Sequence, residues 1–149
     1  MKKLFIPLFV FAFGINAYAY TKAKPLTDPE TIFTKKCVAC HLINAPKTKE
    51  ESSKMSGPPI LKPLKSVTIT IDAVEGPYKD EELREEVIAF IKDYIFNPAP
   101  HKTNCEPEAV EAYGYMPSLK GFISEKEVDI LVPWLYDNFK PHKKNGEWE

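Results

Sequence analysis

This chain has little cysteine, little glycine and no excess of charge of either sign. Its 149 residues include three cysteines and six glycines, and the formal net charge is −1. A chain without bulk positive charge is not typical of nucleic-acid binding, and an odd number of cysteines does not indicate a disulfide framework. Fourteen prolines indicate long ordered loops. With 44% hydrophobic residues, the chain is long enough for one globular domain with its own core.

The chain also lacks a hydrophobic run that would span a bilayer comfortably. Its longest apolar stretch, residues 4–15, is too short for that purpose. Lys2 and Lys3 precede this stretch, and Ala-Tyr-Ala at residues 17–19 has the small-x-small form of a cleavage site. We therefore predict that residues 1–19 are a cleaved secretory signal peptide. An uncleaved membrane anchor is the alternative.

The most specific pattern in the chain is Cys37-Val38-Ala39-Cys40-His41. C-x-x-C-H is the attachment signature of a c-type haem. The two sulfurs form thioether bonds to one haem, and the adjacent imidazole reaches the iron as a ligand. Two other interpretations stay open, a Cys-x-x-Cys redox pair and half of a zinc site. The export signal supports haem, because covalent attachment takes place outside the bacterial cytoplasm in the systems that this pattern resembles.

Three segments with N-terminal capping signals predict the main helices of an all-α fold. The first begins at Asp28, an acidic N-cap followed by a proline at the first helical position. The second has a clear 3.6-residue apolar period and ends at Asn97-Pro98. The last begins with a capping box at Ser124, and Pro133 should kink or loosen it. We expect these helices over residues 28–40, 80–96 and 124–139.

The segments between these helices carry weaker signals. Residues 42–65 are rich in proline and lysine and predict an ordered loop, and Val67 to Ile71 alternate in polarity and predict a short extended segment. The loop 98–115 contains His101, expected to be exposed, and Cys105, expected to be a partly buried free thiol. The expected divisions are a signal peptide (1–19), a flexible lead-in (20–27), one domain (28–139) and a polar, frayed tail (140–149).

Taken in order, these motifs resemble the class I monohaem cytochromes c, and the resemblance covers residues 28–139. Besides C-x-x-C-H, the matching positions are Phe33 four residues before the first cysteine, Gly57-Pro58, Asn97-Pro98, Met116-Pro117 and the aromatic Trp134 in the last helix. The resemblance implies the cytochrome c fold, with three main helices and long loops around one covalently bound haem c. Pro133 and the long segment before the second helix depart from the family pattern.

The resemblance also implies His41 and Met116 as the axial ligands of the iron. A thioether is a soft, neutral donor that raises the potential relative to a second imidazole. The carbonyl of Pro58 would accept Nδ1–H of His41 and fix its tautomer, with a simple rigid turn as the alternative. Met55 as the ligand, a purely packing role for Met116 and a Cys105 thiolate ligand stay open. So does zinc held by Cys37, Cys40, His101 and Cys105.

The function implied by the resemblance is single-electron transfer in the periplasm, without enzymatic activity. The expected partners are redox proteins in the periplasm or at the membrane surface, with no nucleic acid and no small-molecule substrate. The alternative is a haem sensor or small haem enzyme, because the long loop 98–115 would make Met116 a labile ligand. A zinc- or thiol-based interaction domain is a third possibility.

The uneven distribution of charge bears on those partners. Residues 31–66 hold seven lysines and two acids, a net charge of +5, whereas residues 72–93 hold three bases and eight acids, a net charge of −5. Lys35 and Lys36, directly before the first cysteine, are the best-placed candidates for steering a redox partner. Lys47, Lys49 and Lys54 are further candidates, and ordinary solubilising lysines are the alternative.

Overall fold

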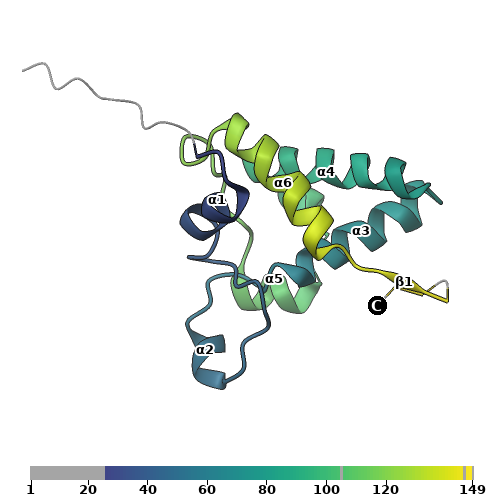
Figure 1. Cartoon of the computed structure of the whole chain (residues 1–149). Helices are drawn as coiled ribbons and strands as arrows, with labels where there is room; N and C mark the ends of the chain where they lie inside the picture. The colour runs from purple at the N-terminus through teal and green to yellow at the C-terminus, as the bar shows by residue number, and fades with distance from the viewer. Residues whose placement is uncertain (1–25, 105, 146, 149) are drawn as a thin grey trace, which may run out of the picture.

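The computed structural model describes residues 26–104, 106–145 and 147–148 (Figure 1). These residues form six α-helices, one short 3₁₀-helix and a two-stranded antiparallel hairpin, so the prediction of an all-α chain is confirmed. The elements are α1 (Pro29–Lys36), α2 (Lys49–Ser53), α3 (Leu61–Glu75), α4 (Asp80–Phe96), η1 (Pro100–Lys102), α5 (Pro107–Tyr113), α6 (Glu125–Phe139), β1 (Lys143–Lys144) and β2 (Glu147–Trp148). The predicted signal peptide lies outside the described residues. Among the described helices, none has the length and apolar character needed to cross a membrane.

The helix α6 is the element on which the others pack. It contacts α4, α1 and α3, and α3 also packs against α4. Figure 1 shows α6 across the front of α4, with α1 and α2 on one side of the molecule and the C-terminal hairpin on the other. The fully buried side chains of the core are Ile32, Phe33, Val87, Val128, Leu131 and Val132.

The predicted starts of the first and last helices are confirmed. The Asp28 carboxylate accepts a hydrogen bond from the backbone N–H of Thr31 at 2.7 Å, so it caps α1 as expected. The helix ends at Lys36, earlier than predicted, and the chain continues in turns. α6 begins with the predicted capping box and continues through Pro133 to Phe139.

The prediction of an extended segment at residues 67–71 was wrong, because this stretch lies inside α3. The alternating β-branched residues suggested a strand, but the burial follows a helical period. The buried positions are Leu64, Val67, Thr68 and Ile71, which is the i, i+3, i+4, i+7 spacing of one helix face. Thr68 adapts to the helix by donating its hydroxyl to the carbonyl of Leu64 at 2.8 Å. Tertiary packing has overridden the local strand propensity.

Two predicted loops and the tail also contain regular structure. Residues 42–65 include α2 and the start of α3, where Pro63 is tolerated because the first-turn N–H groups have no intrahelical partner. The loop 98–115 includes η1 and α5. The tail was expected to be frayed, but β1 and β2 form a hairpin, and Lys143 reaches Asp72 of α3 at 2.7 Å. The long helix α3 is therefore an addition to the three helices that were predicted.

The carboxylate of Glu127 joins the N-terminal lead-in to the start of α6. It accepts hydrogen bonds from the backbone N–H of Leu26 at 3.2 Å and from the N–H and hydroxyl of Ser124, both at 2.8 Å. Burial raises the pKa of Glu127, but the hydrogen bonds from Ser124 and Leu26 outweigh it, and the pKa lies below its ordinary value. The ionised form therefore stabilises the fold.

We predict that Glu127→Gln lowers the free energy of unfolding at pH 7 by on the order of 1 kcal/mol. A carboxyl group with a lowered folded pKa contributes stability that is present above its unfolded pKa of about 4.3 and is lost as the pH falls through the folded pKa. The difference between wild type and variant should therefore shrink at pH 3. Denaturant unfolding at both pH values measures it, with the exposed Glu125→Gln as the charge-matched control. A difference that persists at pH 3 would contradict this origin.

Candidate cofactor-binding site

A cavity of ≈ 350 Å³ lies between the helices and brings together the residues predicted from the C-x-x-C-H motif and the Met-Pro motif. Most of its wall is apolar. The wall residues from the long helices are Leu64 and Val67 of α3, Phe90, Ile91, Tyr94 and Ile95 of α4, and Leu131 and Leu135 of α6. The predicted site residues on the same wall are Cys37, Cys40, His41, Pro58 and Met116. Segments from both halves of the chain therefore meet around one apolar space.

Residues 37–41, which we call the attachment turn, follow directly from the end of α1. The N–H of Cys37 donates to the carbonyl of Phe33 at 2.8 Å, which continues the helical pattern for one more turn. The N–H groups of Cys40 and His41 then both donate to the carbonyl of Cys37, at 3.0 and 2.8 Å. This tight turn places the two thiols and the imidazole on the wall of one cavity.

The ring of His41 is held by the backbone of the following loop. Its Nδ1 lies 2.8 Å from the carbonyl oxygen of Pro58, so the expected hydrogen bond is present. Because a carbonyl can only accept, the proton is on Nδ1, and Nε2 of the neutral ring keeps a free lone pair. Gly57 packs against the same ring. A Cβ at that position would lie 3.0 Å from Cε1 and 3.2 Å from Nδ1 of His41.

Met116 lies on the wall of the same cavity as the attachment turn. It belongs to residues 114–123, which we call the distal segment. The segment is attached to the C-terminal end of α4, where the N–H of Leu119 donates to the carbonyl of Ile95 at 3.0 Å. The hydroxyl of Ser118 donates to the carbonyl of Phe96 at 2.7 Å. These two bonds place Met116, half-buried, on the cavity wall.

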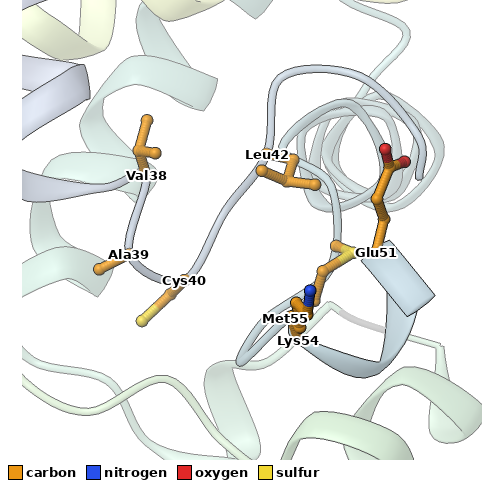
Figure 2. A pocket seen from close by; sticks show the side chains of 7 residues that line it. All are labelled: Val38, Ala39, Cys40, Leu42, Glu51, Lys54 and Met55. Carbon is orange, nitrogen blue, oxygen red and sulfur yellow. The ribbon is translucent and has the colours of Figure 1, made fainter. Parts of the chain in front are cut away.

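Met55, the rival thioether, is not on the wall of this cavity. It lines a separate hollow of ≈ 220 Å³ between the attachment turn and α2, together with Leu42, Glu51 and Lys54 (Figure 2). Figure 2 shows Met55 beside Lys54 at the end of α2, with the sulfur of Cys40 pointing away from them. Met116 is therefore the methionine that shares a cavity with His41.

The environment of the cysteines differs from that of a reactive thiol pair. Cys37 is half-buried and Cys40 is exposed, and both are free. Burial, followed by the charge of a Cys40 thiolate, raises the pKa of Cys37 to about 11. Redox-active Cys-x-x-Cys pairs depend on a lowered thiol pKa. The raised pKa of Cys37 thus argues against the redox-pair interpretation.

The zinc alternative is not supported by the part of the chain that is described. His101 is exposed in η1, as expected, and Cys105 lies outside the described residues. Among residues 26–104, 106–145 and 147–148, no group of three His, Cys, Asp or Glu side chains lies close enough to bind a metal ion. A site built on Cys105 stays an open hypothesis.

Sequence reasoning missed two contributors to the site. The α3 wall was missed because its residues were predicted to be extended, although the apolar spacing of Leu64, Val67 and Ile71 carried a helical signal. The other is Lys36, whose ammonium donates to the carbonyl of Phe122 at 2.6 Å. Nothing in the sequence points to this contact, because any residue supplies a backbone carbonyl.

Comparisons with known proteins give one informative relationship. A protein of Aquifex aeolicus (strain VF5), named as an uncharacterized protein, is 33% identical over 148 residues, which is 94% of this chain and 90% of that protein. No protein-family model matches the chain, and no solved structure matches it. The name of the relative states no ligand or activity.

The contact between Gly57 and His41 gives a test of the ring geometry. Gly57→Ala should push the imidazole by a few tenths of an ångström and weaken its hydrogen bond to Pro58. We expect a loss of about 1–3 kcal/mol in the free energy of unfolding, typical of overpacking, measured by denaturant titration. Ser56→Ala, at the exposed neighbouring position, is the control. Equal stabilities for both variants would contradict a tight packing of Gly57 on the ring.

Proposed function

This chain belongs to the same family as the Aquifex aeolicus protein, and we propose that it is a periplasmic single-electron carrier of the class I monohaem cytochrome c type. One haem c would be bound covalently through Cys37 and Cys40, with His41 and Met116 as axial ligands. The observation that carries the proposal is that these four side chains line a single apolar cavity, although Met116 lies 75 residues beyond His41 in the sequence.

The cavity fits this cofactor in chemistry and in size. Its donor set comprises two thiols, an imidazole with a free Nε2 and a thioether, which are the groups that attach and ligate a c-type haem. Its volume of ≈ 350 Å³ lies in the range of about 300–1,000 Å³ found for cofactor pockets. Bound there, haem would supply an iron centre that accepts and returns one electron.

The protein residues have three tasks in this proposal. The carbonyl of Pro58 keeps the proton on Nδ1 of His41, so that Nε2 is the ligand atom and the ring cannot rotate. The cavity walls from α3, α4 and α6 exclude water. With His41 and Met116 both as ligands, the iron would keep the same ligands in both oxidation states. Electron transfer then needs little rearrangement of the protein.

The packing of α1 on α6 supports the cytochrome c fold in this proposal. Phe33 of α1 lies 6.3 Å from Trp134 of α6, ring centroid to centroid, which is the contact between first and last helices that the resemblance implies. α4 runs into Asn97-Pro98 before the distal segment, as the family pattern requires. The assignment to this fold is part of the proposal.

Export completes the proposed function. Residues 1–19, read as a cleaved signal peptide, would deliver the chain to the periplasm, where the haem is attached. Redox proteins in the periplasm or at the membrane surface are then the partners. The lysine-rich region 31–66 would guide docking.

A haem sensor or small haem enzyme is the second candidate, favoured by the backbone just before Met116. Gly114 has φ +72°, and a Cβ there would meet no atom within 4 Å. Tyr115 is exposed. The distal segment therefore has open space on its N-terminal side, where it could move away from the cavity and leave the iron open to a small ligand.

The test of the proposed function is the visible spectrum of the exported protein together with a haem stain after denaturation. We expect covalently bound haem, a weak sulfur–iron absorption in the far red when oxidised, and resistance to carbon monoxide when reduced. Met116→Ala should admit carbon monoxide, and Met116→His should lower the potential by on the order of 100 mV. Met55→Ala is the control and should change neither property.

Two outcomes would overturn parts of this proposal. Colourless exported protein that binds zinc stoichiometrically would overturn the haem assignment. Haem protein that binds carbon monoxide readily without any change at Met116 would make the sensor or enzyme the better assignment.

The structure separates the two lysines proposed to steer partners. Lys35 is exposed and has no ion pair with any described residue, whereas the ammonium of Lys36 is bound to Phe122. We predict that Lys35→Glu slows reduction by an acidic redox protein a few-fold at low ionic strength, with the deficit vanishing as salt rises. Lys79→Glu, at the residue directly before α4, makes the same charge change and serves as the control. A deficit independent of salt would show that steering is not the cause.

A further inference from the structure

Lys36 connects the two halves of the cofactor site. Its Nζ donates to the carbonyl oxygen of Phe122 at 2.6 Å, and the same ammonium lies 4.5 Å from the centroid of the Phe122 ring. The two residues are 86 positions apart in the sequence. Lys36 directly precedes Cys37, the first residue of the attachment turn, and its side chain lines the cavity. The contact therefore runs between the attachment turn and the distal segment.

The distal segment has attachments on both sides of Met116. Downstream it is bound to the end of α4 through Ser118 and Leu119, by two hydrogen bonds to backbone carbonyls, and Ile123 is buried in the core. Upstream, the N–H of Gly114 donates to the carbonyl of Val110 in α5 at 2.8 Å, while Tyr115 is exposed. The contact with Lys36 adds an attachment to the end of α1.

We propose that Lys36 is a positioning residue that holds the distal segment closed, so that Met116 stays at the cavity. This inference rests on the proposed function for its ligand, but the contact that carries it belongs to the protein alone. A hydrogen bond from a charged donor is among the stronger ones that a protein forms, and the Phe122 ring adds a cation–π contact to the same ammonium. Loss of the contact frees the distal segment on the side that faces α1.

This role differs from the steering role that the sequence suggested for Lys36. A steering lysine acts through its charge at long range, and its neighbour Lys35 would serve equally well. A positioning lysine acts through one contact, and Lys35 cannot replace it because its side chain has no partner among the described residues. Substitutions of Lys35 and Lys36 therefore make the same charge change at adjacent positions, and only the substitution of Lys36 removes the contact.

The experiment compares Lys36→Gln, Lys36→Arg and Lys35→Gln in the exported, haem-containing protein. Imidazole is titrated into the oxidised protein, and its displacement of Met116 is followed by loss of the far-red sulfur–iron absorption. An exogenous ligand binds only the open state, so its apparent affinity rises in proportion to the open fraction. We expect about tenfold tighter imidazole binding for Lys36→Gln. Lys36→Arg should restore most of the wild-type value, and Lys35→Gln should equal wild type.

Hydrogen exchange gives a second measurement that does not depend on haem. The amides of Leu119 and Phe122, both hydrogen-bonded in the closed segment, should exchange about tenfold faster in Lys36→Gln than in wild type. Phe122→Leu keeps the carbonyl acceptor and removes only the ring, so it should show a smaller acceleration. This pair of variants keeps the test decisive even if one of them is poorly stable.

The outcomes separate this inference from the proposed function. Covalent haem with a sulfur–iron absorption, but equal imidazole affinity in wild type and Lys36→Gln, would overturn the role of Lys36 alone. An equal effect of Lys35→Gln would show that the lost charge, and not the lost contact, is the cause. This result would also overturn the positioning role of Lys36. Exported protein without haem would overturn the proposed function. Unchanged amide exchange in Lys36→Gln would then overturn the closing contact itself.

Discussion

The hydrogen bond from Nδ1 of His41 to the carbonyl of Pro58 is the interaction on which the rest of the site depends. It sets the tautomer and the orientation of the ring together, because the carbonyl accepts only a proton carried by Nδ1. Gly57 packs closely on this ring, and a Cβ there would lie 3.0 Å from Cε1, so the ring would have to shift by a few tenths of an ångström. A second bond, from the N–H of Ile60 to the carbonyl of Leu42 at 2.8 Å, closes the same loop. A loop with little regular structure is thus made rigid by a few backbone bonds at its two ends.

The attachment turn in turn depends on the packing of α1 against α6. A helix of eight residues is too short to be stable by itself, so α1 owes its stability to the burial of Ile32 and Phe33. Phe33 meets the Trp134 ring on α6, while Leu131 of the same helix forms part of the cavity wall. The hydrophobic core and the cofactor site therefore share one helix. Any change in the tilt of α6 would move the attachment turn and the cavity wall together.

The sequence allowed prediction of those features whose signal is local. The starts of α1 and α6 followed from side-chain caps at Asp28 and Ser124, and α4 followed from its apolar period. That Cys37, Cys40 and His41 lie on one wall could be predicted because their spacing within the motif is fixed. The extended segment at residues 67–71 was mispredicted because alternation over five residues also fits part of a helix face, and packing decided between them. The contact between Lys36 and Phe122 could not be predicted, because its acceptor is a backbone carbonyl, which every residue type has.

The two sides of the cavity are held with different strength, and this difference bears on function. The imidazole side is fixed by the attachment turn, by the hydrogen bond to Pro58 and by close packing of Gly57. The side of Met116 depends on hydrogen bonds from Ser118, Leu119 and Lys36, together with the bond from Gly114 to α5 and the burial of Ile123. Each such bond contributes about 0.5–3 kcal/mol. When the open state lies only a few kcal/mol above the closed state, the loss of one bond makes a rare open state appreciably populated. Under the proposed function, the carrier and the sensor would differ in the free energy with which these contacts keep the distal segment closed.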